Sequence, residues 1–176
     1  MEVVMVKMIS AFAAGLLALC ATASYAQAPS DAEIAGIVVA ANTVDIEAGK
    51  LAQSRAHNKE VKAFAEQMVT DHSGSNKQAS ELAKKLKLKP ADSATSKGLK
   101  EGGAANMKKL KDLKGAEFDK TYVAQEVTYH QAVLDAIDKT LIPNAQNAEL
   151  KDLLTKTRPV IADHLEHAKM IQGKLK

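Results

Sequence analysis

The sequence predicts an all-α fold, a bundle of four long helices, and three observations lead to that prediction. Glycine and proline are sparse, at 9 and 4 of 176 residues, and aromatic residues make up only 3% of the chain. A β-sandwich or barrel needs many turns, and so few turn residues argue against one. Four segments space their apolar residues three or four positions apart, as amphipathic helices do. The apolar fraction of 46% is typical of a folded domain.

The N-terminal segment resembles a leader rather than part of the fold. The run Met8–Ala23 is apolar and follows a lysine, and Ser24 and Ala26 are the small residues that a signal peptidase reads. We therefore expect a secretory signal peptide over residues 1–26 and a mature domain over residues 27–176. We expect the protein to be exported to the periplasm of a bacterium, with no transmembrane span in the mature chain.

The single cysteine of the sequence lies within that leader. Cys20 follows Leu19, which is large where a lipoprotein signal needs a small residue, so lipidation is the less favoured interpretation. Cleavage after the leader would leave a mature chain without a thiol. A disulfide framework, a zinc site built on cysteines and an iron–sulfur site are thereby excluded.

The first two predicted helices have clear N-terminal signals. The first is predicted over 31–56, because Ser30 and Glu33 have the spacing of a capping box. The second is predicted over 59–88, because Asn58 can cap it and a proline follows its end. The short turn between the two helices makes them antiparallel neighbours.

The last two predicted helices are shaped by prolines. The third is predicted over 116–142 and should end at Pro143. The fourth is predicted over 147–175, with Val160 on its apolar stripe. Pro159 should kink this helix, because its ring crowds the carbonyl group one turn earlier.

The two helical pairs are joined by a long connector, residues 89–115. It exceeds the length of an ordinary hairpin loop. A short helix is expected around residues 107–113. The connector could run the length of the bundle, as in ferritin-like topologies, or fold back at one end, and the sequence leaves both open.

The segment Lys84–Lys120 is strongly basic. It carries 11 lysines and 5 acidic residues, a balance of +6, in a chain whose net charge is only +3. It contains no arginine and a single aromatic residue, Phe118, so base stacking has little to use and no nucleic-acid partner is expected. A weak contact with anionic envelope surfaces and a solvated loop are the two interpretations.

Each predicted helix places one polar side chain of a metal-ligating type on its apolar stripe. These four residues are Asp45, His72, His130 and His164. Glu126 and His167 lie at the stripe edges, one turn from His130 and His164 respectively. A fifth histidine, His57, is expected at the surface.

Two interpretations of these core residues remain open. They could form a structural polar network, because each buried polar group without a partner costs about 1–3 kcal/mol. Alternatively they could bind a divalent transition metal, zinc or copper rather than redox-cycling iron. The ligands would be His72, His130 and His164, with Asp45 or Glu126 as the carboxylate partner. No Glu-x-x-His motif of the di-iron carboxylate bundles occurs in the chain.

Counting residues from the helical turns places two of these histidines at different depths. His130 and His164 differ by about 7 Å along the bundle axis at 1.5 Å per residue. If that offset persists, a site formed by His164 and His167 on one helix face becomes the better geometry. Burial should lower the pKa of all three core histidines relative to the unfolded chain.

Several segments of the chain form a combined pattern. They are FAEQMVTDH at 64–72, FDKTY at 118–122 followed by His130, DIEAGKLA at 45–52, and Pro159 followed by His164. On these segments the sequence resembles the bacterial exported family known as domain of unknown function 4142. The resemblance covers essentially the whole mature chain, and it implies a ferritin-like helical bundle and export. That family is often labelled a predicted outer membrane protein, and it has no established activity.

Two function classes follow from these observations. The first is a periplasmic binding or structural module, linked to envelope stress. The second is a metal-binding protein with a histidine-rich site in the bundle core. No nucleophile–base pair and no acid–base pair of carboxylates is visible, so an enzymatic activity is less favoured than either.

Overall fold

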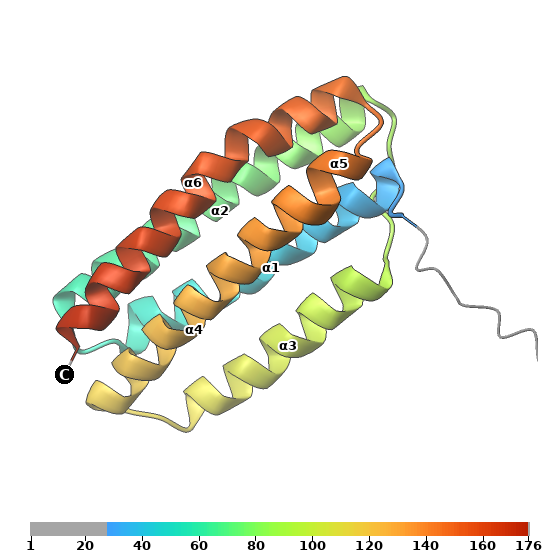
Figure 1. The fold of residues 1–176 in the computed structure, drawn as a ribbon. Helices are drawn as coiled ribbons and strands as arrows, with labels where there is room; N and C mark the ends of the chain where they lie inside the picture. The colour runs from blue at the N-terminus through green and yellow to red at the C-terminus, as the bar shows by residue number, and fades with distance from the viewer. Residues whose placement is uncertain (1–27, 176) are drawn as a thin grey trace, which may run out of the picture.

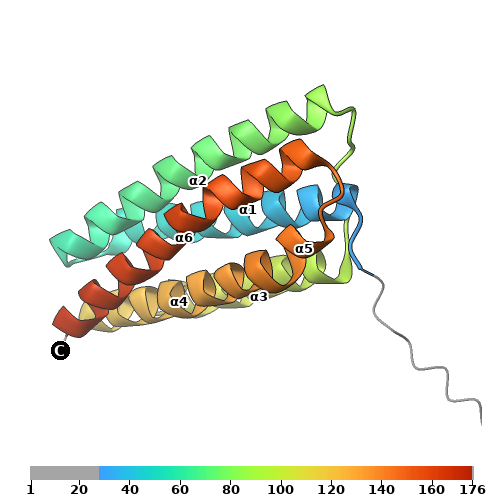
Figure 2. The ribbon, with the colours of Figure 1, turned by 45° about the horizontal axis from the view of Figure 1, so that its top comes forward.

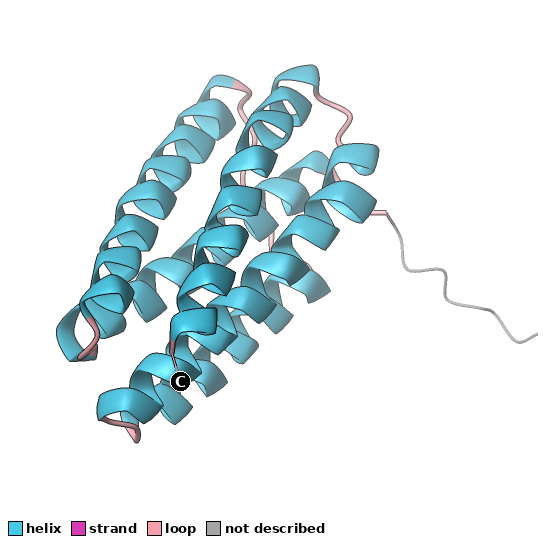
Figure 3. Ribbon diagram, turned by 60° about the vertical axis from the view of Figure 1, so that its left-hand side comes forward, coloured by secondary structure: helices cyan, strands magenta, loops and turns pink. Residues whose placement is uncertain are grey.

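The structure of the protein, a computed structural model, describes residues 28–175. The predicted signal peptide 1–26, with Cys20, lies outside these residues. All of the regular secondary structure within these residues is helical, as predicted (Figure 1, Figure 3). Its elements are α1 (Asp31–Arg55), α2 (Lys59–Lys85), α3 (Ala94–Lys111), α4 (Gly115–Ala136), the π-helix η1 (Ile137–Leu141), α5 (Ile142–Asn144) and α6 (Ala148–Lys174).

The connector differs from the prediction, because it contains a fifth long helix. The short helix expected at 107–113 is instead α3, 18 residues long, and it runs beside the bundle (Figure 1, Figure 2). Ser93 caps α3, and its side chain accepts a hydrogen bond from the backbone N–H of Ser96. A Cβ atom on Gly103 would come within 2.8 Å of the Val44 methyl groups, so glycine here allows α3 to approach α1 closely. The glycines of α3 lower its intrinsic helix propensity, which hides the helix in the sequence.

The N-terminal signals predicted for the first two helices are confirmed, and α6 has a cap of the same kind. Ser30 and Glu33 form both halves of a capping box at the start of α1. Asn58 accepts hydrogen bonds from two backbone N–H groups at the start of α2, and Asn147 does the same for α6. Each cap satisfies N–H groups that have no partner within the helix.

The turn between α1 and α2 is bonded to the other helical pair. The two carboxylate oxygens of Asp119, near the start of α4, accept the backbone N–H groups of His57 and Asn58 at 3.1 and 2.8 Å. Asp119 is buried. A side chain of the second pair therefore satisfies the backbone of the first.

The turn before α6 has the reciprocal arrangement. The two carboxylate oxygens of Asp31, at the start of α1, accept the backbone N–H groups of Gln146 and Asn147, both at 2.9 Å. The two turns lie at opposite ends of the bundle (Figure 1). We call this pair of contacts the reciprocal clasp.

Pro143 acts differently from the prediction. The third helix does not end at Pro143 but continues through η1 and α5 to Asn144. Pro143 lacks a backbone N–H group and so cannot donate to the carbonyl group one turn earlier. The turn before it is wider and has π-helical hydrogen bonds. The helix α6 runs unbroken through Pro159. Val160, predicted to face the core, is 43% exposed, and the buried residue of that turn is Ile161.

The core consists of two apolar clusters at the two ends of the bundle. The aromatic end lies near the C-terminus, and the aliphatic end lies near α5 (Figure 1). The aromatic end comprises Ala48, Ala52, Val61, Phe64, Ala65, Met68, Leu110, Phe118, Tyr122, Val123, Ala168 and Ile171. The aliphatic end comprises Ile34, Ile37, Ile137, Leu141, Ala145, Leu150, Leu154 and Ile161.

Membrane-spanning character is not found in the described part of the chain. None of the helices within residues 28–175 combines the length and the hydropathy that crossing a bilayer requires.

Candidate metal centre

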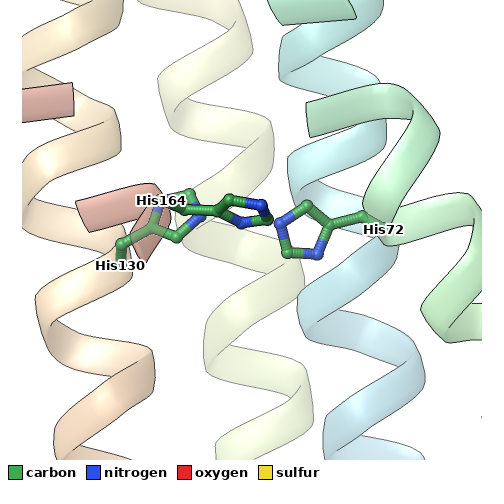
Figure 4. A group of neighbouring side chains, drawn as sticks. All are labelled: His72, His130 and His164. Atoms are coloured by element: carbon green, nitrogen blue, oxygen red, sulfur yellow. The ribbon is translucent and has the colours of Figure 1, made fainter. Parts of the chain in front are cut away.

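A cluster of polar side chains lies between the two apolar ends. Asp45 comes from α1, His72 from α2, His130 from α4 and His164 from α6, and each is at most 4% exposed. The three imidazole rings converge, with centroids 5.3–5.6 Å apart (Figure 4). Together with Glu126, also buried, these residues are called the polar cluster. The stripe positions in the sequence therefore identified four side chains that meet in space.

The expected depth offset does not separate the histidines. The ring centroids of His130 and His164 are 5.4 Å apart. A residue count from the turns overstates the offset, because it assumes parallel helix axes that begin at one level. The reserve geometry built on His164 and His167 is therefore not needed to bring ligand atoms together.

The carboxylate of Asp45 lies at the centre of the polar cluster. Its Oδ2 atom is 3.1 Å from His72 Nε2 and 3.4 Å from His130 Nε2. These contacts lack hydrogen-bond geometry, and neither oxygen of Asp45 has a hydrogen-bond partner within residues 28–175. The Asp45 oxygens and the two Nε2 atoms therefore lie close together without forming hydrogen bonds to one another.

Two of the histidines are oriented by partners outside the cluster. His72 Nδ1 lies 2.8 Å from the side-chain oxygen of Asn42, and the amide nitrogen of Asn42 donates to the Ser75 hydroxyl at 3.1 Å. His164 Nε2 lies 2.9 Å from Asp71 Oδ2. In each contact the partner is an acceptor, so the ring nitrogen carries the proton and donates it.

The third histidine follows the same rule. His130 Nδ1 lies 3.0 Å from the backbone carbonyl oxygen of Glu126, which accepts its proton. Each ring therefore keeps one nitrogen with a free lone pair. These nitrogens are His72 Nε2, His130 Nε2 and His164 Nδ1, and none has a hydrogen-bond partner in the described chain. One ring nitrogen from each of the three histidines lies within 4.8 Å of the other two.

The two buried carboxyl groups titrate in opposite directions. Burial raises the pKa of Asp45, but the contact with His72 and the charges of the neighbouring histidines outweigh it and hold this pKa below its ordinary value. Burial, followed by repulsion from Asp45, raises the pKa of Glu126 to about 7. Near neutral pH the carboxyl group of Asp45 is therefore ionised, whereas that of Glu126 is only partly ionised.

The histidines do not all behave as expected from burial alone. Burial lowers the pKa of His164, as predicted, and its hydrogen bond to Asp71 only partly offsets this. For His130 the prediction is wrong. Burial lowers its pKa too, but the contacts with Glu126 and the charge of Asp45 outweigh burial and raise it.

The two stripe-edge residues have different locations. The Oε2 atom of Glu126 lies 3.3 Å from His130 Nδ1, so Glu126 joins the polar cluster. His167 does not reach it: its Nδ1 lies 3.2 Å from the side-chain oxygen of Gln67. Its ring packs edge-on against Phe64, with centroids 5.2 Å apart.

Several residues around the cluster were not singled out from the sequence. Asn42 lies three residues before Asp45, hence on the same helix face, and that spacing could have identified it. Tyr129 donates its hydroxyl to the carbonyl oxygen of Ala41 at 2.9 Å, joining α4 to α1. Burial, then the charge of Glu126, raises the pKa of Tyr122 well above its ordinary value. Tyr122 belongs to the FDKTY motif at 118–122, which gives no sign of its burial beside the cluster, and Tyr129 belongs to none of the motifs.

The fold and site together define a class: a helical-bundle protein with buried imidazole and carboxylate groups at its centre. The sequence model of the family described as domain of unknown function DUF4142 matches residues 17–171, and the chain belongs to this family. No curated protein matches the sequence.

One solved structure shows a similar fold. It is the crystal structure of a secreted-protein candidate, DUF305, from Streptomyces coelicolor. Its TM-score is 0.70 at 14% sequence identity, and the match covers 82% of this chain and 93% of that chain. At this identity the likeness concerns the fold alone.

Proposed function

We propose that the protein binds one divalent transition metal ion at the polar cluster. His72, His130 and His164 would be the ligands, and Asp45 would be the fourth. The observation that supports this is the convergence of one ring nitrogen from each of the three histidines within 4.8 Å, with the unpartnered carboxylate of Asp45 at 3.1 and 3.4 Å from two of the rings. Each such group costs about 1–3 kcal/mol when buried, and a single ion would satisfy all of them.

The contacts outside the cluster support the same proposal. Metal-binding histidines usually donate their second ring N–H to a carbonyl or carboxylate group, which fixes the tautomer and the ring orientation. Asn42, Asp71 and the backbone of Glu126 supply these acceptors. In a purely structural network the inner nitrogens would need donors, and no donor lies in hydrogen-bond geometry with them within residues 28–175.

The ligand types favour zinc or copper. Imidazole-rich sites suit zinc, copper and nickel, and no thiolate is present in the mature chain to favour copper(I). The absence of a Glu-x-x-His motif separates this site from the carboxylate-rich iron centres of ferritin-like bundles. A tetrahedral ion needs ligand atoms about 3.4 Å apart, so small side-chain rotations would draw the nitrogens inward.

The cellular setting is the second part of the proposal. The leader predicted over 1–26 supports export, and we propose that the mature protein is a ferritin-like bundle that works in the periplasm. A role in binding or in envelope stress agrees with such a location. The first residue of protein purified from the periplasm, expected at Gln27, tests the export.

The metal proposal is tested by melting chelated, untagged protein with and without Zn²⁺ or Cu²⁺. At a hundredfold excess over Kd, binding should stabilise the fold by about 2.7 kcal/mol. His72→Gln, His130→Gln and His164→Gln should lose this shift. The matched controls His57→Gln and His167→Gln should keep it, because neither side chain reaches the cluster.

Two results would contradict the proposal. One is a wild-type protein with no metal-induced shift and no metal bound after purification. The other is an equal shift in all five variants, which would mean that the ions bind elsewhere on the chain.

A further inference from the structure

An apolar cavity adjoins the polar cluster on its aliphatic side. It measures about 200 Å³, and it is lined by residues of α1, α2, α3, α4, η1 and α6. Polar groups of the cluster, Asp45, His72 and His130, lie in its wall. Most of the remaining wall is aliphatic, as with Val38, Leu99 and Leu153 among others.

The cavity exists because small residues and a widened turn leave it unfilled. Ala41, Ala132 and Ala136 line it where larger side chains would close it. Ile137 and Leu141 of the π-helix η1 also line it, and π-helical turns recur at functional sites. The only aromatic side chain in its wall other than the histidines is Tyr129.

The cavity leads from the surface to the polar cluster. Ala132 and Thr95, on α4 and α3, are exposed, whereas Asp45 and His130 are buried at the other side of the same space. A molecule that enters between α3 and α4 can therefore reach the cluster with one of its ends.

We propose that this cavity binds a small amphiphile, with an aliphatic body of about eight carbons and a single carboxylate head directed at the metal ion. The proposal rests on the metal site proposed above. An apolar cavity of about 150 Å³ holds a six-carbon ring, and by that ratio 200 Å³ holds about eight carbons. The aliphatic wall excludes a polar body, because such a body would lose its hydrogen bonds to water.

The charge of the cluster explains the choice of head group. Without an ion, the ionised Asp45 repels a carboxylate. A divalent ion reverses the local charge, and by expanding from four to five ligands it can offer an anionic oxygen a direct partner. The metal and the amphiphile should therefore strengthen each other's binding by an equal factor.

The test is a calorimetric titration of octanoate into metal-free and Zn²⁺-loaded protein. Octanoate should bind the loaded protein at least tenfold more tightly, within the usual range of coupling between two sites. Butyrate, four methylenes shorter, should bind roughly two-hundredfold more weakly than octanoate.

Variants that fill the cavity locate the binding site. Ala136→Phe should abolish octanoate binding but keep Zn²⁺ binding, because Ala136 lies in the aliphatic wall and is not a ligand. Ala132→Phe, at the exposed mouth, serves if the first variant does not fold. The matched control Ala63→Phe, on an exposed position of α2, should bind both ligands as the wild type does.

The two proposals fail in distinguishable ways. Absence of Zn²⁺ binding in a titration of the metal alone overturns the metal site. If Zn²⁺ binds normally, either of two results overturns the cavity proposal. One is that octanoate does not bind the wild type, and the other is that Ala132→Phe binds octanoate as well as Ala63→Phe does. The choice of a carboxylate head group is overturned if the metal-free protein binds octylamine and the Zn²⁺-loaded protein does not bind octanoate.

Discussion

The two ends of the bundle are built differently. At the aromatic end, Phe64 and Phe118 each lie 6.4 Å, between ring centroids, from Tyr122, and all three rings are fully buried. The aliphatic end has no aromatic member, and it contains the π-helical turn and the cavity of about 200 Å³. The polar cluster lies between them. One end is packed for stability, and the other leaves space beside the groups that could bind a ligand.

The largest expected effect tests the packing of the aromatic end. Phe64→Ala should destabilise the protein by about 3–5 kcal/mol, because the ring is fully buried among other side chains. Leu141→Ala, at the aliphatic end, should cost only about 2 kcal/mol, because one side of Leu141 already borders the cavity. Urea unfolding measures both.

A size-matched control removes the difference between phenylalanine and leucine. Leu110 is fully buried at the aromatic end, so Leu110→Ala should destabilise the protein by about 3 kcal/mol or more. Equal costs for Leu110→Ala and Leu141→Ala would show that the two ends are packed alike.

The next effect concerns the polar cluster in the metal-free protein. The pKa of Glu126 is raised to about 7 in the fold and is near 4.5 in the unfolded chain. Between these values the folded state binds more protons, so this residue makes stability fall as pH rises from 4.5 to 7. Its slope approaches about 1.4 kcal/mol per pH unit at most.

Glu126→Gln should remove that contribution. The stability of the variant relative to that of the wild type should therefore increase as pH rises from 5 to 7.5. His130, whose pKa is also raised, makes stability fall further as pH rises near neutral pH. His164, whose pKa is lowered, has the opposite effect, because its contribution to stability is lost as pH falls. The exposed Glu166→Gln is the control. Parallel pH profiles for wild type and Glu126→Gln in chelated protein would refute this prediction.

The smallest expected effect compares one enlargement at each end. Ala136→Leu should stabilise the protein by about 0.5–2 kcal/mol, because it fills part of the cavity. Ala65→Leu, at a fully buried position of the aromatic end, should destabilise it by about 1–3 kcal/mol through overpacking. Thermal melts of the two variants should shift in opposite directions, and shifts of the same sign would contradict the comparison.

The sequence was informative where a feature depends on local periodicity. The capping residues Ser30 and Asn58 and the buried positions of His72, His130 and His164 all follow from helical spacing, and the structure agrees with each. In each case a polar residue stands out against an apolar stripe or directly before one.

The sequence was uninformative where a feature depends on packing between helices. The helix α3 was missed, because its glycines suit a close approach to α1 that no local pattern reveals. The π-helical turn before Pro143 and the cavity behind it arise from the space between helices. The depth of His164 relative to His130 likewise depends on how the two helices are placed, which residue counting does not capture.

The reciprocal clasp has a consequence for folding. Each helical pair closes its own turn with a carboxylate that belongs to the other pair, Asp119 for the first and Asp31 for the second. A pair folding alone would leave two backbone N–H groups of its turn without these acceptors. The hydrogen bonds of each turn therefore depend on the docking of the other pair, and the four turn amides should be protected from exchange with solvent only while the two pairs are docked.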